Sequence, residues 1–327
     1  KNRLIQEGDF IKQLDLSSVL GRLRARGAGD FYTGLMGRQL VTSVTKAGGS
    51  LSHGDLRSYV PQWRPTLKIP FIKNTTFHFP TSVGHSGVLA GQMIGMFIEN
   101  DDWEDSSPTE RAHLMAEIAG RAYAARNRWL RKGGTSAVEP TKLVSESNLE
   151  EMIADFQSER HRPMENTGGA PVAQPGKSTG TSFVAVDRRG SAVACTLTLN
   201  NLFGVGRVAQ GMGILLAGLP GPLGRGPNST AAALLINNVH NVFYYAAAAS
   251  GGDEAPSALA GVTARTILGK EEEDLETAIA GKRLHNNGQP DVTYYEKGLK
   301  QTIIQALEDK GHRLNPVQSM GLVNAVF

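Results

Sequence analysis

Residues 180–216 carry the pattern that most limits how this chain can fold. Val184–Asp187 and Ala192–Leu199 are apolar, alternating and rich in β-branched residues, and Arg188-Arg189-Gly190 lies between them. Two such runs around a short turn segment predict a pair of antiparallel strands. The second run leads directly into Asn200-Asn201-Leu202-Phe203-Gly204 and a glycine-dense loop. The sequence therefore predicts a β-hairpin whose second strand ends in a polar, glycine-rich loop.

Composition narrows the class of protein. Of the 327 residues, 40% are hydrophobic and 20% are charged, which is enough to bury the core of one large domain or two ordinary ones. The formal net charge is only +3. The short basic clusters at 22–26 and 126–132 hold a single aromatic residue, Trp129, and are typical of solvated helix faces, so we expect no nucleic-acid partner. No apolar run reaches the roughly 18 residues that a membrane span needs.

Cysteine and histidine usage argues against a disulfide and against a metal. Cys195 is the only cysteine, which excludes a disulfide within the chain, and its place in a strand predicts a small buried hydrophobe. The eight histidines do not cluster along the sequence, and no His-Glu-x-x-His motif or cysteine pair occurs. We therefore expect no metal site and no cofactor, and we expect His53, His113 and His312 at the surface or at helix ends.

The order of the predicted elements divides the chain into three parts. Residues 1–159 form a mainly helical part, residues 160–179 a linker with little periodicity, and residues 180–327 a strand-rich part. Further strands are expected at 63–69, 76–79, 230–237, 241–247 and 292–296, and helices at 14–46, 87–99, 109–132, 148–158, 256–268, 275–282 and 299–310. Three serines, Ser52, Ser107 and Ser147, are expected to cap helices. This order predicts an α/β (α+β) fold, a four-layer α-β-β-α sandwich with antiparallel sheets in which the hairpin strands are adjacent and central.

Five short motifs lie in and after the hairpin: Val186-Asp187, Arg189-Gly190, Thr198-Leu199-Asn200, Phe203-Gly204 and Gly213–Leu216. Their order and spacing resemble the start of the small subunit of the gamma-glutamyltransferase family, which are N-terminal-nucleophile hydrolases. Weaker matches extend along the chain, at 29–34, 48–49, 80–87, 122–126, 283–285, 290–291 and 311–312. The family's first glycine- and alanine-rich segment and its last short strands have no counterpart. The chain is therefore expected to be a partial copy, an incomplete record of a longer protein or one half of an assembly.

The resemblance implies a specific chemistry. Members of this family cut themselves to expose a threonine, whose freed α-amine is the general base for hydrolysis or transfer of an amide. The register places Gly180 at the position of that threonine. Thr181 is the better remaining candidate for the nucleophile, provided that Gly180 marks a β-bulge that reorients its side chain, and Thr179 is the weaker one. Because Gly180 has no hydroxyl, we expect the bonds around 179–181 to remain uncut.

Other site residues follow from the same resemblance. Gly251-Gly252 matches the paired glycines whose backbone N–H groups form the oxyanion hole, although a Gly-Gly turn after a strand needs no function. Asn200 matches an asparagine that contacts the glutamyl group, and it fits equally an asparagine that closes a turn. Asn228-Ser229 stands where a serine pair contacts the substrate carboxylate. The acid that binds the substrate ammonium is replaced by residues 217–221, which carry no carboxylate.

Two functions from different classes remain open at this point. One is a divergent gamma-glutamyltransferase-like protein, impaired in gamma-glutamyl amide hydrolysis or transfer, whose partner is a gamma-glutamyl-type small molecule. The alternative is a catalytically inactive structural or interaction subunit that uses the same fold within a larger complex and binds a protein partner. The residues themselves give no compartment. Only the resemblance points to a periplasmic or extracellular location.

Overall fold

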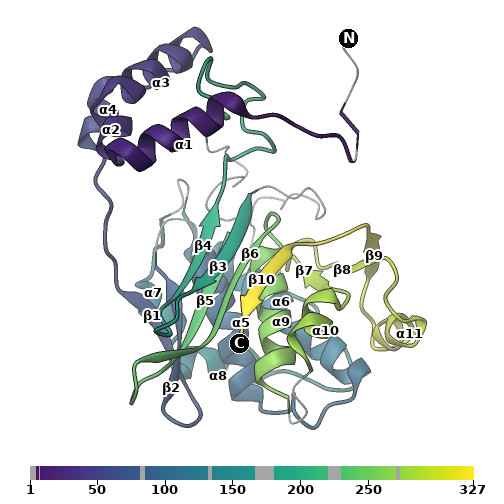
Figure 1. Cartoon of the computed structure of the whole chain (residues 1–327). Helices are drawn as coiled ribbons and strands as arrows, with labels where there is room; N and C mark the ends of the chain where they lie inside the picture. The colour runs from purple at the N-terminus through teal and green to yellow at the C-terminus, as the bar shows by residue number, and fades with distance from the viewer. Residues whose placement is uncertain are drawn as a thin grey trace. The chain divides into compact units, whose positions relative to one another are not determined.

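The computed structural model describes residues 5–6, 8–81, 85–131, 135–165, 180–219, 230–269 and 273–327. Contacts divide the chain into two compact units. The smaller unit comprises Lys1–Trp63 and Phe203–Gly218, and the larger unit comprises Arg64–Leu202 and Leu219–Phe327. Figure 1 shows the elements of both units. The division at residues 160–179, which was drawn from sequence pattern, stays a prediction.

The smaller unit packs short helices against the glycine-dense loop. Its helices are α1 (Leu14–Arg26), α2 (Gly29–Tyr32), α3 (Leu35–Lys46) and α4 (His53–Ser58). Their apolar faces bury a small core made of Val19, Met36, Leu40, Leu56, Ala209, Met212 and Leu216. Gly213 has a φ of +66°, and a Cβ there would lie 2.6 Å from the backbone nitrogen of Leu16. Only glycine therefore lets the loop approach α1 this closely.

The larger unit is built on a five-stranded antiparallel sheet. The strand order is β1 (Thr66–Phe71), β2 (Thr75–Pro80), β5 (Thr230–Asn237), β6 (Val242–Ser250) and β10 (Leu322–Val326). Residues 245–250 of β6 are all buried, which requires both faces of the sheet to be covered because strand side chains alternate. The predicted strands at 63–69, 76–79, 230–237 and 241–247 are thus confirmed in kind, with ends that differ by up to three residues.

The predicted hairpin is present as β3 (Thr181–Val186) and β4 (Ala192–Leu197), paired antiparallel. It packs on one face of β5, β6 and β10. Its adjacency is confirmed, but its expected place in the middle of a sheet is wrong, because the two strands form a two-stranded sheet of their own. The five-stranded sheet already has its own partners for β6 on both sides, so the hairpin stacks on that sheet instead of joining it.

The outer face of the hairpin is apolar and exposed. Phe183 is 48% exposed, Val193 51% and Leu197 50%. Cys195, paired with Phe183, is half-buried. The expectation of a buried cysteine is therefore wrong, because this face has no covering layer among the described residues of the larger unit.

Helices cover the other face of the sheet (Figure 1). Helices α5 (Ser86–Asn100) and α9 (Ala255–Ile267) pack on the sheet, with α6 (Pro108–Trp129), α7 (Pro140–Leu143) and α8 (Glu146–Ile153) beside α5. The caps predicted at Ser52 and Ser107 are confirmed, each with a reciprocal capping box. The cap predicted at Ser147 is wrong, because α8 begins at Glu146 and Ser145 holds the cap position.

A small third sheet completes the larger unit. It contains β7 (Leu284–Asn286), β8 (Thr293–Glu296) and β9 (Leu314–Val317), and α10 (Leu275–Ala280) and α11 (Gln301–Asp309) accompany it. Strands β7, β9 and β10 were not predicted from the sequence. The fold class is confirmed as a mixed α/β fold with antiparallel sheets, although β8 and β9 pair parallel in the third sheet. The larger unit shows a helical layer, a central sheet and the stacked hairpin in that order.

Candidate functional site

Gly180, the position predicted to correspond to the nucleophile, lies directly before β3 at one end of the hairpin. Its φ is +89°, and a Cβ added there would lie 2.8 Å from the carbonyl oxygen of Leu197 and 3.3 Å from Cγ2 of Thr230. The left-handed φ and the close carbonyl together favour glycine at this position. The backbone at the expected site of attack is therefore shaped for a residue without a side chain.

Thr181, the better candidate nucleophile, is the first residue of β3 and is exposed. It pairs with Leu197, and the β3–β4 register runs without a shift from Thr181 to Val186. The bulge that would turn Thr181 inward is thus absent from the paired strand. Side chains alternate along a strand, so the hydroxyl of Thr181 lies on the outer face of the hairpin, away from the five-stranded sheet.

Ser182 occupies the inner face instead. Its hydroxyl donates to the carbonyl oxygen of Ala248 at 3.1 Å, and Nδ2 of Asn324 donates to the backbone oxygen of Ser182 at 3.0 Å. These bonds tie β3 to β6 and β10. Ser182 is 8% exposed, so its hydroxyl is a buried structural group that pins the hairpin to the sheet.

Gly180 belongs to a small polar corner at the end of the sheet, which we call the Gly180 corner and define as Gly180, Thr198, Thr230 and Ser250. The Cβ position of Gly180 is 3.6 Å from Cβ of Thr198, and Thr230 pairs with Ser250 across β5 and β6. The hydroxyl of Ser250 is buried and has no hydrogen-bond partner within the described residues. The sequence analysis missed Thr230 and Ser250, because isolated hydroxyl residues at strand ends carry no motif.

The Gly251-Gly252 turn follows Ser250 and so begins at the same corner. Both glycines have positive φ, +135° and +107°. A Cβ at Gly251 would lie 2.5 Å from Cα of Gly321, and a Cβ at Gly252 would lie 2.9 Å from Oε2 of Glu254. The turn is therefore sterically specific. A carboxylate beside it opposes the binding of an anion at the adjacent N–H groups, which weakens the predicted oxyanion hole.

Asn200 lies in the loop after β4 with a φ of +66°. Its backbone N–H donates to Oγ1 of Thr198 at 2.9 Å. Asparagine tolerates the left-handed region better than most residues, so the local backbone alone gives a reason for an asparagine here. Its predicted contact with a glutamyl group stays a prediction. Thr179 and Asn228-Ser229 lie outside the described residues.

Buried polar side chains of α6 contact the residue that follows the Gly251-Gly252 turn. The hydroxyl of Tyr123 donates to the carbonyl oxygen of Asp253, and the guanidinium of Arg126 lies 4.9 Å from the centre of the Tyr123 ring. Nη1 of Arg126 is 3.9 Å from Oδ2 of Asp253. Burial raises the pKa of Asp253, and the charge of Arg126 offsets part of that shift. Helix α6 thereby fixes the turn through its 123–126 segment.

A second buried group lies beside it. Nδ1 of His285 is 2.8 Å from Oγ of Ser257, and its other ring nitrogen contacts Oδ1 of Asn287. Burial lowers the pKa of His285 to about 4, although the bond to Asn287 works in the other direction. The imidazole is therefore neutral at pH 7 and ties α9 to the β7 segment.

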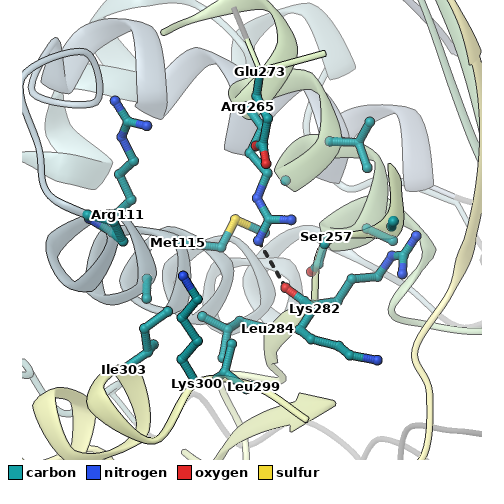
Figure 2. A pocket seen from close by; sticks show the side chains of 18 of the residues that line it. Arg111, Met115, Ser257, Arg265, Glu273, Lys282, Leu284, Leu299, Lys300 and Ile303 are labelled. Atoms are coloured by element: carbon teal, nitrogen blue, oxygen red, sulfur yellow. Dashed lines mark hydrogen bonds between the residues drawn. The ribbon is translucent and has the colours of Figure 1, made fainter. Parts of the chain in front are cut away.

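A cavity of about 950 Å³ lies between α6 and α9, and Ser257 is one of its lining residues. Figure 2 shows it lined by cationic side chains, among them Arg111, Arg265, Lys282 and Lys300. Arg265 donates to the carbonyl oxygen of Lys282 at 2.9 Å. Of the predicted site residues that the structure describes, none lines this cavity. The cavity is thus a separate feature from the described residues of the predicted site.

The histidines correct one expectation from the sequence. His53 is exposed at the start of α4, as expected. His113 and His312 were also expected at the surface or at helix ends, yet they are 1% and 5% exposed. Nδ1 of His113 lies 2.8 Å from Nε2 of His312. The expectation is wrong because 199 residues of sequence separate two side chains that the fold brings into contact.

The fold is of the N-terminal-nucleophile hydrolase type. The structure resembles the crystal structure of cephalosporin acylase from Bacillus halodurans, with a TM-score of 0.74 and 18% identity over 94% of this chain and 57% of that one. The sequence profile of the family described as gamma-glutamyltranspeptidase matches residues 1–218 and 221–327. The chain therefore belongs to the gamma-glutamyltranspeptidase family.

Two curated relatives show the extent of the match. The glutathione hydrolase proenzyme of Pseudomonas aeruginosa is 30% identical over 217 residues, which cover 65% of this chain and 38% of that protein. The glutathione hydrolase proenzyme of Escherichia coli K12 is 23% identical over 345 residues, covering 99% of this chain and 59% of that protein. The chain thus spans between about two fifths and three fifths of the length of these relatives. None of its described helices combines the length and the apolar character needed to cross a membrane.

Proposed function

We propose that this chain is a gamma-glutamyltranspeptidase-family protein in which hydrolysis and transfer of gamma-glutamyl amides are impaired. In this proposal residues 1–159 are the large-subunit-like part, 160–179 the segment at which relatives would be processed, and 180–327 the small-subunit-like part. The substrate class, a gamma-glutamyl amide, comes from the family. Asn200 and Asn228-Ser229 are its proposed contacts.

One observation carries the proposal: the conformation of Gly180. Attack on a γ-glutamyl carbonyl needs a hydroxyl at the corner and a free α-amine beside it. Gly180 supplies no hydroxyl, and its φ of +89° with the carbonyl of Leu197 2.8 Å from a Cβ position disfavours any replacement. Thr181 faces outward in an unshifted ladder. The side chains around the expected nucleophile therefore give little support for efficient catalysis.

The direct test is hydrolysis of a gamma-glutamyl anilide by the purified protein, with and without an acceptor dipeptide. We expect near-background rates, no gain from the acceptor, and one uncut polypeptide by intact mass. Thr181→Ala and Thr179→Ala should leave these rates unchanged. Thr181→Ser is the matched control, because it retains a hydroxyl. A parent rate about 10²-fold or more above Thr181→Ala, retained in Thr181→Ser, would identify Thr181 as the nucleophile and overturn the proposal.

A second candidate function, an inactive structural or interaction subunit, is favoured by the outer face of the hairpin. Phe183, Val193 and Leu197 are each about half exposed, and contiguous exposed apolar residues mark interaction sites more often than random surface. Exposed residues kept for a partner contribute little to folding. Val193→Ser and Leu197→Ser should thus change the free energy of unfolding by less than about 0.5 kcal/mol. A larger loss would mean that this face packs within the chain.

A further inference from the structure

Three metal-ligating side chains meet in the interior of the larger unit. His113 and Glu117 lie one turn apart on α6, so both face the same side of the helix. His312 comes from the segment between α11 and β9. One potential ligand atom from each residue lies within 4.8 Å of the other two. The exposed fractions are 1% for His113, 0% for Glu117 and 5% for His312, so the cluster is closed to solvent.

The outer nitrogen of each histidine is held by an oxygen of a neighbouring residue. Nε2 of His113 is 2.8 Å from the backbone oxygen of Gln157, which can only accept, so this nitrogen carries the proton. In the neutral ring, the inward Nδ1 of His113 is then a lone-pair donor. Nδ1 of His312 is 3.2 Å from Oγ1 of Thr293. Metal-bound histidines characteristically have this arrangement, in which an oxygen bonded to the second ring nitrogen fixes the orientation of the ring.

Glu117 is oriented by its neighbours in the same way. Oε2 forms an ion pair with Arg121, and Oε1 contacts Nδ1 of His161, whose Nε2 is 2.8 Å from Oδ2 of Asp291. The backbone N–H of Arg162 adds a weaker bond to Oε1 at 3.3 Å. Oε1 also faces Nε2 of His312 at 3.9 Å.

We propose that Nδ1 of His113, Nε2 of His312 and Oε1 of Glu117 together bind one divalent transition-metal cation, with Zn²⁺ the best match. Two imidazoles and one carboxylate form a donor set suited to zinc. Zinc lies about 2.0–2.1 Å from such donors, which places the donors roughly 3.3 Å apart around a tetrahedral ion. The histidine pair at 2.8 Å must open by about 0.5 Å, and the Glu117–His312 pair at 3.9 Å must close by about as much.

The proton balance of binding is simple. Without the ion, Nε2–H of His312 donates to Nδ1 of His113, the only arrangement in which the Gln157 bond is also satisfied. With the ion, the proton of His312 moves to Nδ1, where Oγ1 of Thr293 accepts it. The ion also displaces the 3.3 Å bond from Arg162 to Glu117. No net proton is lost from the histidines, and the ion would tie α6 to the segment before β9.

Carboxylates and basic side chains both surround the proposed ion. Glu117, Asp155 and Asp291 are the carboxylates of this cluster, and Arg121 and Arg162 pair with Asp155. His161 lies between the other two carboxylates. Because the three ligands are buried and come from two separate segments, the bound ion would act as a cross-link between those segments.

The test uses the full chain, first stripped with a chelator and then incubated with ZnCl₂ and desalted. Elemental analysis should give about one zinc per chain, and the melting temperature should rise with added zinc because a ligand of the native state stabilises it. His113→Gln and His312→Gln should abolish this uptake. His53→Gln, an exposed histidine outside the cluster, and His285→Gln, a buried one, are the matched controls and should retain it.

Removing a buried histidine can unfold the chain, so a milder variant keeps the test decisive. Thr293→Val removes only the hydroxyl behind His312, and it should weaken zinc binding by roughly 10–100-fold while the chain stays folded. A folded parent that takes up no zinc would overturn the proposal and leave a hydrogen-bonded network of neutral histidines. Uptake that is unchanged in Thr293→Val, or lost equally in His53→Gln, would also overturn it.

Discussion

Replacing Gly180 with alanine tests whether the backbone at the expected nucleophile position is built for glycine. Two effects act on the new methyl group. A non-glycine residue at a φ of +89° is strained, and the Cβ would lie 2.8 Å from the carbonyl oxygen of Leu197. That carbonyl belongs to a residue paired with Thr181 in the β3–β4 ladder. It therefore cannot move away without breaking the pairing at the end of the hairpin.

The magnitude can be separated into its two parts by a control in the same hairpin. Gly190, in the β3–β4 turn, has a φ of +80° and no heavy atom within 4 Å of a Cβ position. Gly190→Ala should cost only the conformational part, about 1 kcal/mol. Gly180→Ala should cost that plus an overpacking term of about 1–2 kcal/mol. We therefore expect a total loss of roughly 2–3 kcal/mol at Gly180.

The assay is urea unfolding followed by tryptophan fluorescence. Trp103 and Trp129 are 4% and 3% exposed in the larger unit, whereas Trp63 is fully exposed, so the signal reports mainly on the unit that contains both glycines. Equal losses for Gly180→Ala and Gly190→Ala would refute the steric argument. If Gly180→Ala cost nothing, the left-handed conformation itself would be refuted.

Three further outcomes follow from the structure. Gly180→Thr should give no gain in gamma-glutamyl anilide hydrolysis, since the strained position misdirects the hydroxyl; a clear gain in that assay would contradict the assignment of the backbone. Ser107→Ala should lower the free energy of unfolding in urea by about 1 kcal/mol, because it removes a capping box. Ser145→Ala should cost less, because the hydroxyl of Ser145 makes no cap bond. Equal losses in the two variants would contradict this. Burial lowers the pKa of His285 to about 4, against about 6.5 in the unfolded chain. The contribution of His285 to the free energy of unfolding is therefore complete above about pH 6.5 and is lost as the pH falls toward 4. Between pH 7 and pH 4.5 the parent should lose roughly 2–3 kcal/mol more than His285→Gln, and parallel losses in the two proteins would show that His285 is not the titrating group.

Local patterns predicted the elements that depend on neighbouring residues. The hairpin at 184–199 follows from alternation around a glycine turn, and the caps at Ser52 and Ser107 follow from serines placed directly before helical segments. The cap at Ser147 was misplaced because two serines, Ser145 and Ser147, offer equivalent caps two residues apart. Packing of α8 against α5 selected the earlier start.

Elements that depend on distant partners were not visible in the sequence. Strand β10 has only five residues, and its partner β6 lies more than 70 positions earlier in the chain. Separation along the sequence is also the reason why the contact of His113 with His312, and the pairing of Thr230 with Ser250 at the Gly180 corner, were not predicted. No local spacing encodes these approaches, because the fold alone sets them.

The conformation of Gly180 bears on what kind of divergence this chain represents. If a threonine had simply been exchanged for glycine, the backbone would retain a conformation that accepts a side chain, and one substitution would restore the hydroxyl. Here the left-handed φ, the 2.8 Å approach to the Leu197 carbonyl and the inward hydroxyl of Ser182 bonded to Ala248 all depend on one another. A side chain at Gly180 meets both the left-handed φ and the close carbonyl, and a one-residue shift of β3 along β4 that relieved them would turn Ser182 and Val184 to the opposite face. The glycine is therefore part of the packing of the hairpin.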